Sequence, residues 1–306
     1  MPNFFFPITW LLPEFEGDVC GNDLVRVHKR KWEVPIFDLY SLVAEHHPIR
    51  VPAELMQVFL QSVNLEFETT GRDFPEAADR IDAYRAMLYL RGTCPTVAPF
   101  GCNTSLNAYA GINARSSGHQ ATMHEGMREG ITHATARVET WSHELSFVCI
   151  VGEPGQFTRN VSEGVADGVA QDMTKWLAFE KETPVLRAAR RALVKAPLIP
   201  DLGSSILHIW QGIEGLFPSI STEITFRTSL LLAELLAPLN SRSVTYEAAK
   251  KSYGDRSRIS HGSQKPVSME NWARAWLLLR DALQAILLHG SMPNEEDLTR
   301  SLLKDD

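Results

Sequence analysis

The sequence lacks the features that mark several large classes of protein. It has no apolar run near the roughly 20 residues that cross a bilayer. Its four cysteines show no CxxC spacing, which excludes a zinc ribbon. The apolar start Phe4–Leu12 lacks a basic region before it and is broken by Pro7, so it predicts a buried strand rather than a signal peptide. We therefore expect a cytoplasmic protein whose cysteines are free thiols.

Familiar catalytic signatures are also missing. No GxxxxGK[ST] and no GxGxxG occurs, which disfavours a P-loop NTPase and a Rossmann enzyme. The GxSxG of many hydrolases is absent as well. The sequence therefore points to no nucleotide cofactor, and we expect a protein that works without one.

An excess of positive charge is lacking too. The net charge is −7, whereas a protein that binds nucleic acid over a broad surface is usually basic. The charge is uneven: residues 1–175 hold 14 Lys/Arg and 22 Asp/Glu, and residues 176–306 hold 16 and 15. Only the C-terminal part suits a polyanion, and any such contact should be local.

Composition and the positions of turn-forming residues predict an α+β protein of two domains. Residues 1–180 mix short apolar runs with helices, and residues 181–306 are almost entirely helical in pattern. Pro197 and Pro200 close a basic segment with no acid after Thr183, and the boundary falls between 175 and 200. We interpret that basic segment as a surface connector helix, with a second contact for RNA as the alternative.

Alternation and apolar spacing give the expected elements. Strands are predicted at 8–12, 25–27, 34–37, 65–69 (half-buried) and 145–151, and 55–60 fits either a strand or a helix. Helices are predicted at 76–91, 123–138, 163–181, from 183 up to Pro197, 204–217, 223–236, 244–260, from 269 to about 286, and in a short tail from 294. The last long helix should present Met269, Trp272, Trp276, Leu279, Leu283 and Ile286 as a bundle seam.

One stretch of the C-terminal part concentrates chemically useful side chains. Tyr253–Gly262 contains Arg256, Arg258 and His261, and Gly262 permits a left-handed cap that ends the helix there. Five residues turn an α-helix by about 140°, so Arg256 and His261 do not share one face. The two side chains converge only if the helix is loosened near His261 or if a second chain supplies the facing wall.

Arginine and histidine together suit one reaction of RNA. Arginine offers a planar set of donors that fits a phosphate, and histidine exchanges a proton near neutral pH. Because RNA carries its own nucleophile, the 2′-hydroxyl, such a pair is sufficient for cleavage without a metal. The ordinary alternative is that these residues form a helix cap, a surface ion pair or a solvated face.

The stretch resembles a known family. Arg256-x4-His261 matches the R-x4-6-H signature of the HEPN superfamily, and Tyr253–Gly262 is similar to its ApeA-like branch. Ile209–Phe217, which includes Glu214, resembles the first core helix of that branch, and Thr225–Ala233 resembles the second. The resemblance covers about residues 200–290, and Ser257 departs from the Asn, Asp or His that many active members carry after the arginine.

The resemblance implies a metal-independent endoribonuclease with an all-α HEPN-like domain, in antiphage defence or a toxin-like role. It implies His261 as general acid/base, Arg256 on the scissile phosphate and Glu214 as the acid that orients Arg256. The further candidates are Tyr253, Ser257 and Arg258 as supporting residues and Lys250, Lys251 and Lys265 as RNA contacts. It also implies a homodimer through the third and fourth helices of the domain and a phage-derived or protein trigger, with no membrane partner.

Two other functions stay open. The first is a non-catalytic HEPN module that binds RNA, a nucleotide or a protein, with the N-terminal domain as sensor. The second is a metalloenzyme, because His119, His124, His133 and His143 fall within one short stretch. Their spacing does not form HExxH or a clear helical pair, which favours satisfied or exposed histidines and no metal.

Overall fold

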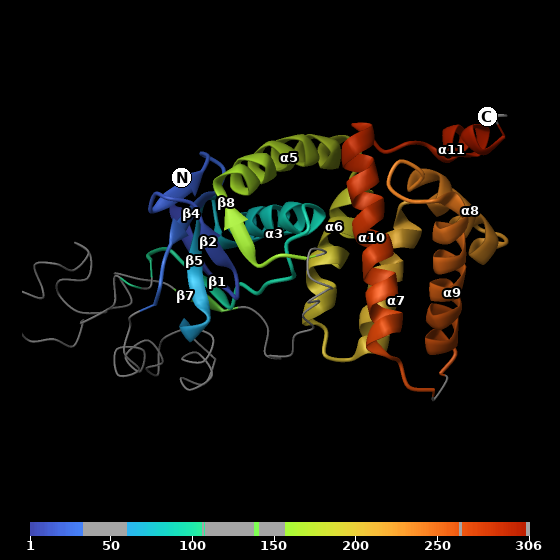
Figure 1. Ribbon diagram of the computed structural model, residues 1–306, viewed down its shortest axis with the longest axis horizontal. Helices are drawn as coiled ribbons and strands as arrows, with labels where there is room; N and C mark the ends of the chain where they lie inside the picture. Colours follow the sequence, from blue (N-terminus) through green and yellow to red (C-terminus); the bar gives the residue numbers. More distant parts are fainter. Residues whose placement is uncertain (33–59, 106, 108–137, 141–156, 263–264, 304–306) are drawn as a thin grey trace, which may run out of the picture. The chain divides into compact units, whose positions relative to one another are not determined.

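The computed structural model describes residues 1–32, 60–105, 107, 138–140, 157–262 and 265–303 (Figure 1). It divides into two compact units. Unit 1 comprises 1–84, 96–145 and 157–170, and unit 2 comprises 85–95, 146–156 and 171–306. The N-terminal sheet and the C-terminal helices confirm the predicted α+β class. Among the described residues, no helix is both long and apolar enough to cross a membrane.

Unit 1 is built on a six-stranded antiparallel sheet in the order β3-β4-β5-β1-β6-β7. The strands are β1 Asn3–Thr9, β3 Val19–Gly21, β4 Arg26–Lys29, β5 Val63–Thr70, β6 Phe100–Cys102 and β7 Val138–Thr140. A separate parallel pair joins β2 Leu12–Glu14 to β8 Asn160–Ser162. Cys20, Cys94 and Cys102 form no disulfide among the described residues.

The first strand differs from the prediction at 8–12. It starts at Asn3 and ends at Thr9, because Trp10 takes a left-handed conformation with φ 63° and separates β1 from β2. The prediction for the strand at 65–69 is also wrong in one respect. β5 is almost completely buried rather than half-buried, and even Glu66 is 0% exposed. Arg30 on the neighbouring stretch compensates this charge, with Nε 3.3 Å from the Glu66 carboxylate.

Two long helices follow from clear local signals. α3, Phe74–Leu90, ends before Gly92, which has φ 83°. α5, Glu163–Glu182, begins after Ser162, whose hydroxyl accepts a hydrogen bond from the Val165 N–H at 3.2 Å. Both helices were predicted within a few residues, because end signals of this kind lie in the local sequence. The division between the units falls within both helices.

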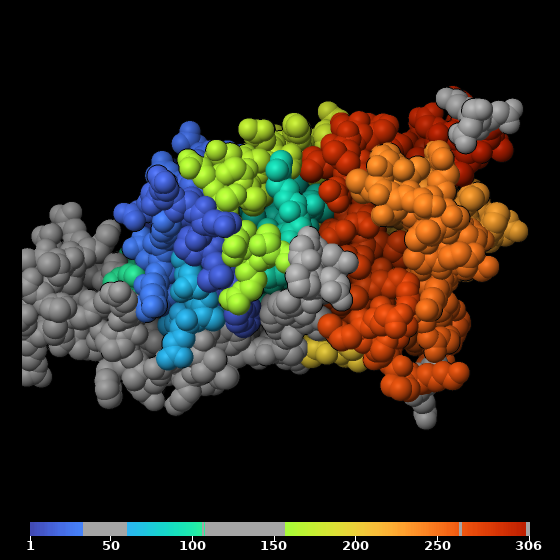
Figure 2. Space-filling model, viewed as in Figure 1, coloured from blue at the N-terminus to red at the C-terminus, as the bar shows by residue number. Residues whose placement is uncertain are grey.

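The helices of unit 2 give the C-terminal half its bundle (Figure 1). They are α6 Val185–Lys195 with a 3-10 turn Ala196–Leu198, α7 Leu202–Gly215, α8 Ile224–Leu235, α9 Arg242–Ser260, α10 Met269–His289 and α11 Glu295–Leu302. Asp201 caps α7, and Ser268 and Asn271 form a capping box on α10, which ends at Gly290 with φ 86°. In Figure 2 the surfaces of α8, α9 and α10 adjoin.

Tryptophans form the centre of this bundle. Trp176, Trp210, Trp272 and Trp276 are all 0% exposed. Trp272 stacks on Trp276 with 6.0 Å between ring centroids, and its indole donates to the Ser205 hydroxyl at 2.6 Å. Each of these four indole N–H groups donates to an acceptor, as burial requires. The predicted seam of α10 is therefore correct except for Met269, which is 44% exposed at the start of the helix.

The basic segment after Thr183 is more than a connector. α6 packs against α7 and α10, and Arg190 is 0% exposed. Its guanidinium donates hydrogen bonds to Glu180 from Nε at 2.5 Å and from Nη2 at 3.2 Å. The Trp176 indole donates to the same carboxylate at 2.7 Å. The interpretation of this helix as wholly superficial is wrong for Arg190.

Several predictions lie outside the described residues. These are the strands at 34–37 and 145–151, the segment 55–59 and the helix at 123–137. The same holds for Cys149 and for His119, His124, His133 and His143. Val138, the last residue of that predicted helix, begins β7.

Candidate functional site

Helix α9 carries the Arg–His motif and is anchored to α7 by aromatic contacts. The Trp210 indole of α7 donates to the Ser252 hydroxyl of α9 at 3.0 Å. The Trp210 ring also meets the Tyr253 ring edge to face, with centroids 5.1 Å apart. Both contacts are buried, so they fix the rotation of α9 about its axis and set which of its residues reach the surface.

Arg256 is held at the surface by α7. Its Nη2 lies 3.1 Å from Oε1 of Glu214 and donates to Oε2 at 3.2 Å. The predicted pairing of Glu214 with Arg256 is therefore confirmed. The guanidinium carbon also lies 5.5 Å from the centre of the Tyr253 ring, which favours a cation over its face.

The two contacts leave part of the Arg256 guanidinium uncommitted. Its Nε and Nη1 donate to no residue within the described part of the chain. The side chain is 29% exposed, so these donors are reachable from solvent. An arginine held through one nitrogen with its other donors open suits a bound oxyanion, because the planar guanidinium offers donors in several directions.

Tyr253 supports this arrangement as a neutral phenol. Burial raises the pKa of the Tyr253 hydroxyl, the Arg256 charge lowers it, and the Glu214 charge raises it further. Tyr253 therefore stays protonated at neutral pH. Since it is only 9% exposed, its role is to pack beneath Arg256 rather than to exchange protons with a ligand.

His261 stands at the end of the same helix. Its N–H still donates to the Ser257 carbonyl at 3.1 Å, and the Gly262 N–H donates to Ile259 at 3.0 Å. Gly262 has φ 73°, the predicted left-handed cap. His261 is exposed, and its ring has no partner within the part of the chain that the structure describes.

The regular end of α9 decides between two ways of bringing Arg256 and His261 together. A helix loosened before His261 is excluded, because α9 is α-helical through Ser260 and the next N–H keeps its bond four residues back. The two side chains therefore leave one chain about 140° apart around the axis. Ser257 lies between them, half-buried, with its carbonyl also accepting from the Ser260 hydroxyl at 2.9 Å.

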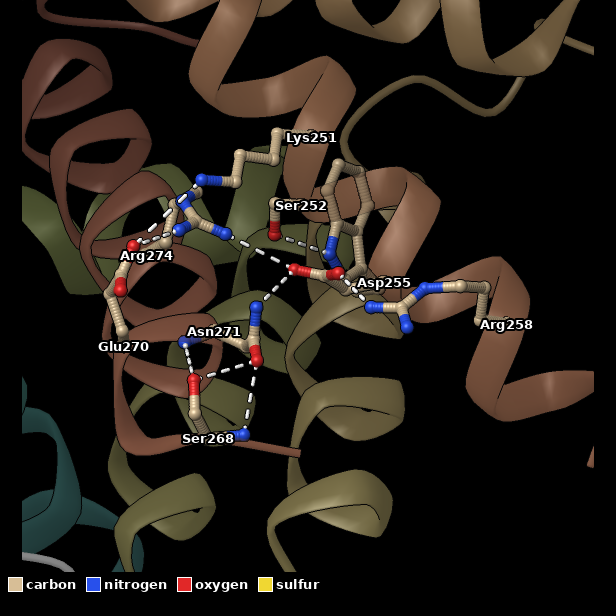
Figure 3. A network of polar contacts seen from close by, with 9 residues as sticks. Lys251, Ser252, Asp255, Arg258, Ser268, Glu270, Asn271 and Arg274 are labelled. Atoms are coloured by element: carbon tan, nitrogen blue, oxygen red, sulfur yellow. Dashed lines mark hydrogen bonds and ion pairs between the residues drawn. The ribbon is translucent and has the colours of Figure 1, made fainter. Parts of the chain in front are cut away.

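Arg258 belongs to a polar network around Asp255 rather than to the Arg256 site (Figure 3). Arg258 donates to one oxygen of Asp255. The other oxygen accepts from Asn271 at 2.8 Å and from Arg274 at 3.1 Å, both on α10. Asp255 is 7% exposed, so this network ties the last turns of α9 to the start of α10.

The three lysines predicted to contact RNA differ in their surroundings. Lys250 lies over the Tyr246 ring at 5.7 Å, and Lys251 is 3.9 Å from Glu270 with both side chains well exposed. Lys265 lines a very small cavity of about 10 Å³ beside Asp255 and Arg258, which has room for a single water. Among the described residues, no hydrogen bond or ion pair joins Arg256 to any of the three.

Sequence reasoning missed the residues that hold α9 in place. Asp255 had one local signal, its position three residues before Arg258 on the same helix. Asn271 and Arg274 come from another helix, and nothing in their own sequence context points to Asp255. Within the described ranges, no group of three His, Cys, Asp or Glu residues is arranged to hold a metal ion.

No protein-family model matches this chain, and no curated protein and no solved structure matches it either. The HEPN resemblance therefore rests on the motif and its flanking helices and stays a prediction.

Proposed function

We propose that this protein is a cytoplasmic, metal-independent endoribonuclease of HEPN type, acting in antiphage defence or a toxin-like role. The observation that carries the proposal is Arg256, fixed by Glu214 and Tyr253 with open donors, on the same helix as an exposed His261. Arg256 binds the scissile phosphate, and Glu214 is the positioning residue that orients it.

In this mechanism the 2′-hydroxyl attacks the adjacent phosphorus while His261 accepts its proton. The P–O5′ bond breaks, and the departing 5′ oxygen takes up the proton that His261 accepted. The products are a 2′,3′-cyclic phosphate and a 5′-hydroxyl. Arg256 stabilises the charge that grows on the phosphoryl oxygens, so neither a metal nor a cofactor takes part.

The proposed site needs two copies of the chain. Arg256 and His261 point about 140° apart in one copy, so one groove receives both groups only when a second copy faces it. We propose a homodimer through α9 and α10. A mixture of Arg256→Ala and His261→Ala proteins tests this, because a mixed dimer retains one arginine and one histidine. Recovery of cleavage in the mixture supports a shared site, and inactivity of the mixture argues for a site within one chain.

Cleavage of labelled RNA in EDTA tests the function directly. Wild type should yield cyclic-phosphate ends, and Arg256→Ala and His261→Ala should each lose about 10²-fold or more of the rate. Arg300→Ala on α11 removes an arginine away from the motif, one that is more exposed than Arg256, and serves as control. A cut that His261→Ala leaves unchanged, or that EDTA abolishes, overturns the proposal.

A second candidate function follows from the same divergence of the two side chains. In a monomer, Arg256 and His261 do not converge, and the site is then a non-catalytic module for RNA, a nucleotide or a protein, with unit 1 as sensor. Expression separates the two: a catalytic toxin is harder to produce as wild type than as His261→Ala, whereas a binding module shows no difference. A sensor role for unit 1 also implies a phage-derived or protein trigger.

A further inference from the structure

A groove with one basic wall lies between α6 and α7, away from the Arg–His motif in sequence. Its volume is about 410 Å³. Arg187 and Arg191, one turn apart on α6, line one wall, and His208 and Gln211 on α7 line the other. Both arginines are exposed, Arg187 with 54% of its side chain. The groove therefore presents two guanidinium groups to solvent on one side.

The groove owes its floor to a close approach of the two helices. A Cβ added at Gly212 would lie 2.8 Å from the Cβ of Ala192, which is too near for both to stay in place. Because Gly212 has no side chain, α7 lies close to α6, and the longer side chains of Arg187, Arg191 and Gln211 surround this point of contact.

Arginines outnumber the acid that pairs with them beside the groove. Glu180 forms an ion pair with Arg187 at 3.8 Å, and the same carboxylate also accepts two hydrogen bonds from the buried Arg190 and one from Trp176. No Asp or Glu occurs from Thr183 to Pro200. Burial lowers the pKa of His208, and its hydrogen bond with Gln211 opposes that shift only in part, so this ring is a neutral hydrogen-bonding group.

The groove and Arg256 lie on the same open side of α7. Gln211 is exposed, and His208 and Glu214 lie three residues before and after it, each about 60° around the helix in opposite directions. Ala192 of α6 meets α7 on the His208 flank at Gly212, and Arg256 of α9 meets it on the Glu214 flank. Along the axis of α7, His208 and Glu214 are about 9 Å apart.

We propose that the α6–α7 groove binds the phosphodiester backbone of single-stranded RNA and leads the strand across Gln211 to Arg256. This inference rests on the proposed function. Two guanidinium groups one turn apart suit successive phosphates, whereas Gln211 and His208 offer neutral hydrogen bonds to sugar or base. A local basic path of this kind is compatible with the net charge of −7, because the contact with the polyanion stays confined to one part of the surface.

Binding of a fluorescent oligouridylate to the full-length chain tests the groove, followed by anisotropy over a range of salt concentrations. His261→Ala serves as the background, so that the probe stays intact. Adding Arg187→Ala and Arg191→Ala should weaken binding about tenfold or more. It should also reduce the slope of log K against log salt by about 1.4, since each lost phosphate contact removes about 0.7 for single strands.

Two further variants keep the test specific. Gln211→Glu places a carboxylate in the groove without removing an arginine, and it should weaken binding as well. Arg300→Ala removes a charge from α11, where the side chain is 71% exposed, and should leave affinity and slope unchanged. The proposed RNA site in the groove is overturned if the salt slope is the same with and without Arg187 and Arg191. An equal loss of affinity in Arg300→Ala overturns it as well.

The outcomes separate the groove from the nuclease. RNA that binds through Arg187 and Arg191 but is never cut supports the groove and overturns the proposed function. Cleavage by wild type with a KM that Arg187→Ala/Arg191→Ala leaves unchanged overturns the groove and supports the function. If both hold, the double variant raises KM, whereas Arg256→Ala lowers kcat.

Discussion

Two arginines of unit 2 pair with glutamates across helices, yet their surroundings are opposite. Arg190 is 0% exposed, and its carboxylate partner also accepts from Trp176. Arg256 is 29% exposed, its partner Glu214 is 30% exposed, and two of its nitrogens have no acceptor in the described structure. Both pairs join an arginine to a glutamate on another helix, but of these two only the Arg256 pair is accessible to solvent and leaves guanidinium donors open.

A third pair stands between these two. Arg242 at the start of α9 donates to Glu234 on α8 at 2.6 Å. The arginine side chain is 52% exposed and the glutamate side chain only 5%. Because the acid is buried and the base is not, this pair should contribute to stability without being open to a ligand on its acidic side.

The largest effect on stability is expected at the buried pair. Arg190→Ala leaves the Glu180 charge buried without its partner, and the free energy of unfolding should fall by about 3–5 kcal/mol. Urea unfolding of the purified protein measures this. The double variant Arg190→Met/Glu180→Gln should recover most of the loss, since it removes both charges. A loss below about 1 kcal/mol in Arg190→Ala would break the comparison.

At the exposed pair the effect should fall on activity instead. Arg256→Lys keeps the charge but loses the planar set of donors, so it cannot hold Glu214 and a phosphate together. We expect RNA cleavage to fall about 10²-fold, while the free energy of unfolding changes by less than about 1 kcal/mol. If Arg256→Lys unfolds easily but still cuts RNA at the wild-type rate, Arg256 has a structural role like that of Arg190.

The intermediate pair should appear in the pH dependence of stability. The hydrogen bond from Arg242 holds the pKa of Glu234 below its usual range, against burial, with help from Ser301. A lowered folded-state pKa gives stability that is present above the unfolded value of about 4.3 and is lost as pH falls through the folded value. Wild type should therefore lose stability in acid more steeply than Glu234→Gln, as urea titrations at several pH values would record. Parallel curves would contradict this.

The smallest effect is expected from Gly254, which lies between Tyr253 and Asp255 in α9. A Cβ there meets nothing within 4 Å, so alanine should fit. Gly254→Ala should stabilise the protein by about 0.5–1 kcal/mol, because glycine loses more backbone freedom in a helix. Thermal unfolding measures the gain, and cleavage should stay unchanged. Destabilisation would show that α9 needs flexibility beside the site.

Local signals in the sequence located most of the helices. Gly92, Ser162 and Gly262 end or begin helices near the predicted positions, and α10 buries the predicted tryptophans. Strand ends were harder, because Trp10 adopts a left-handed conformation that its residue type does not favour. The pairing of Glu214 with Arg256 was accessible because both lie in recognisable motifs.

By itself, the sequence determined the α+β class, the helical C-terminal half and the helix that carries Arg256 and His261. Only the tertiary structure decided which charges are free to act. Arg190 is buried against Glu180, Arg258 is bound to Asp255, and Arg256 keeps open donors. The reason is physical: caps and apolar spacing act over a few neighbouring residues, whereas the partner of a charge and its access to water depend on helices that meet only after folding.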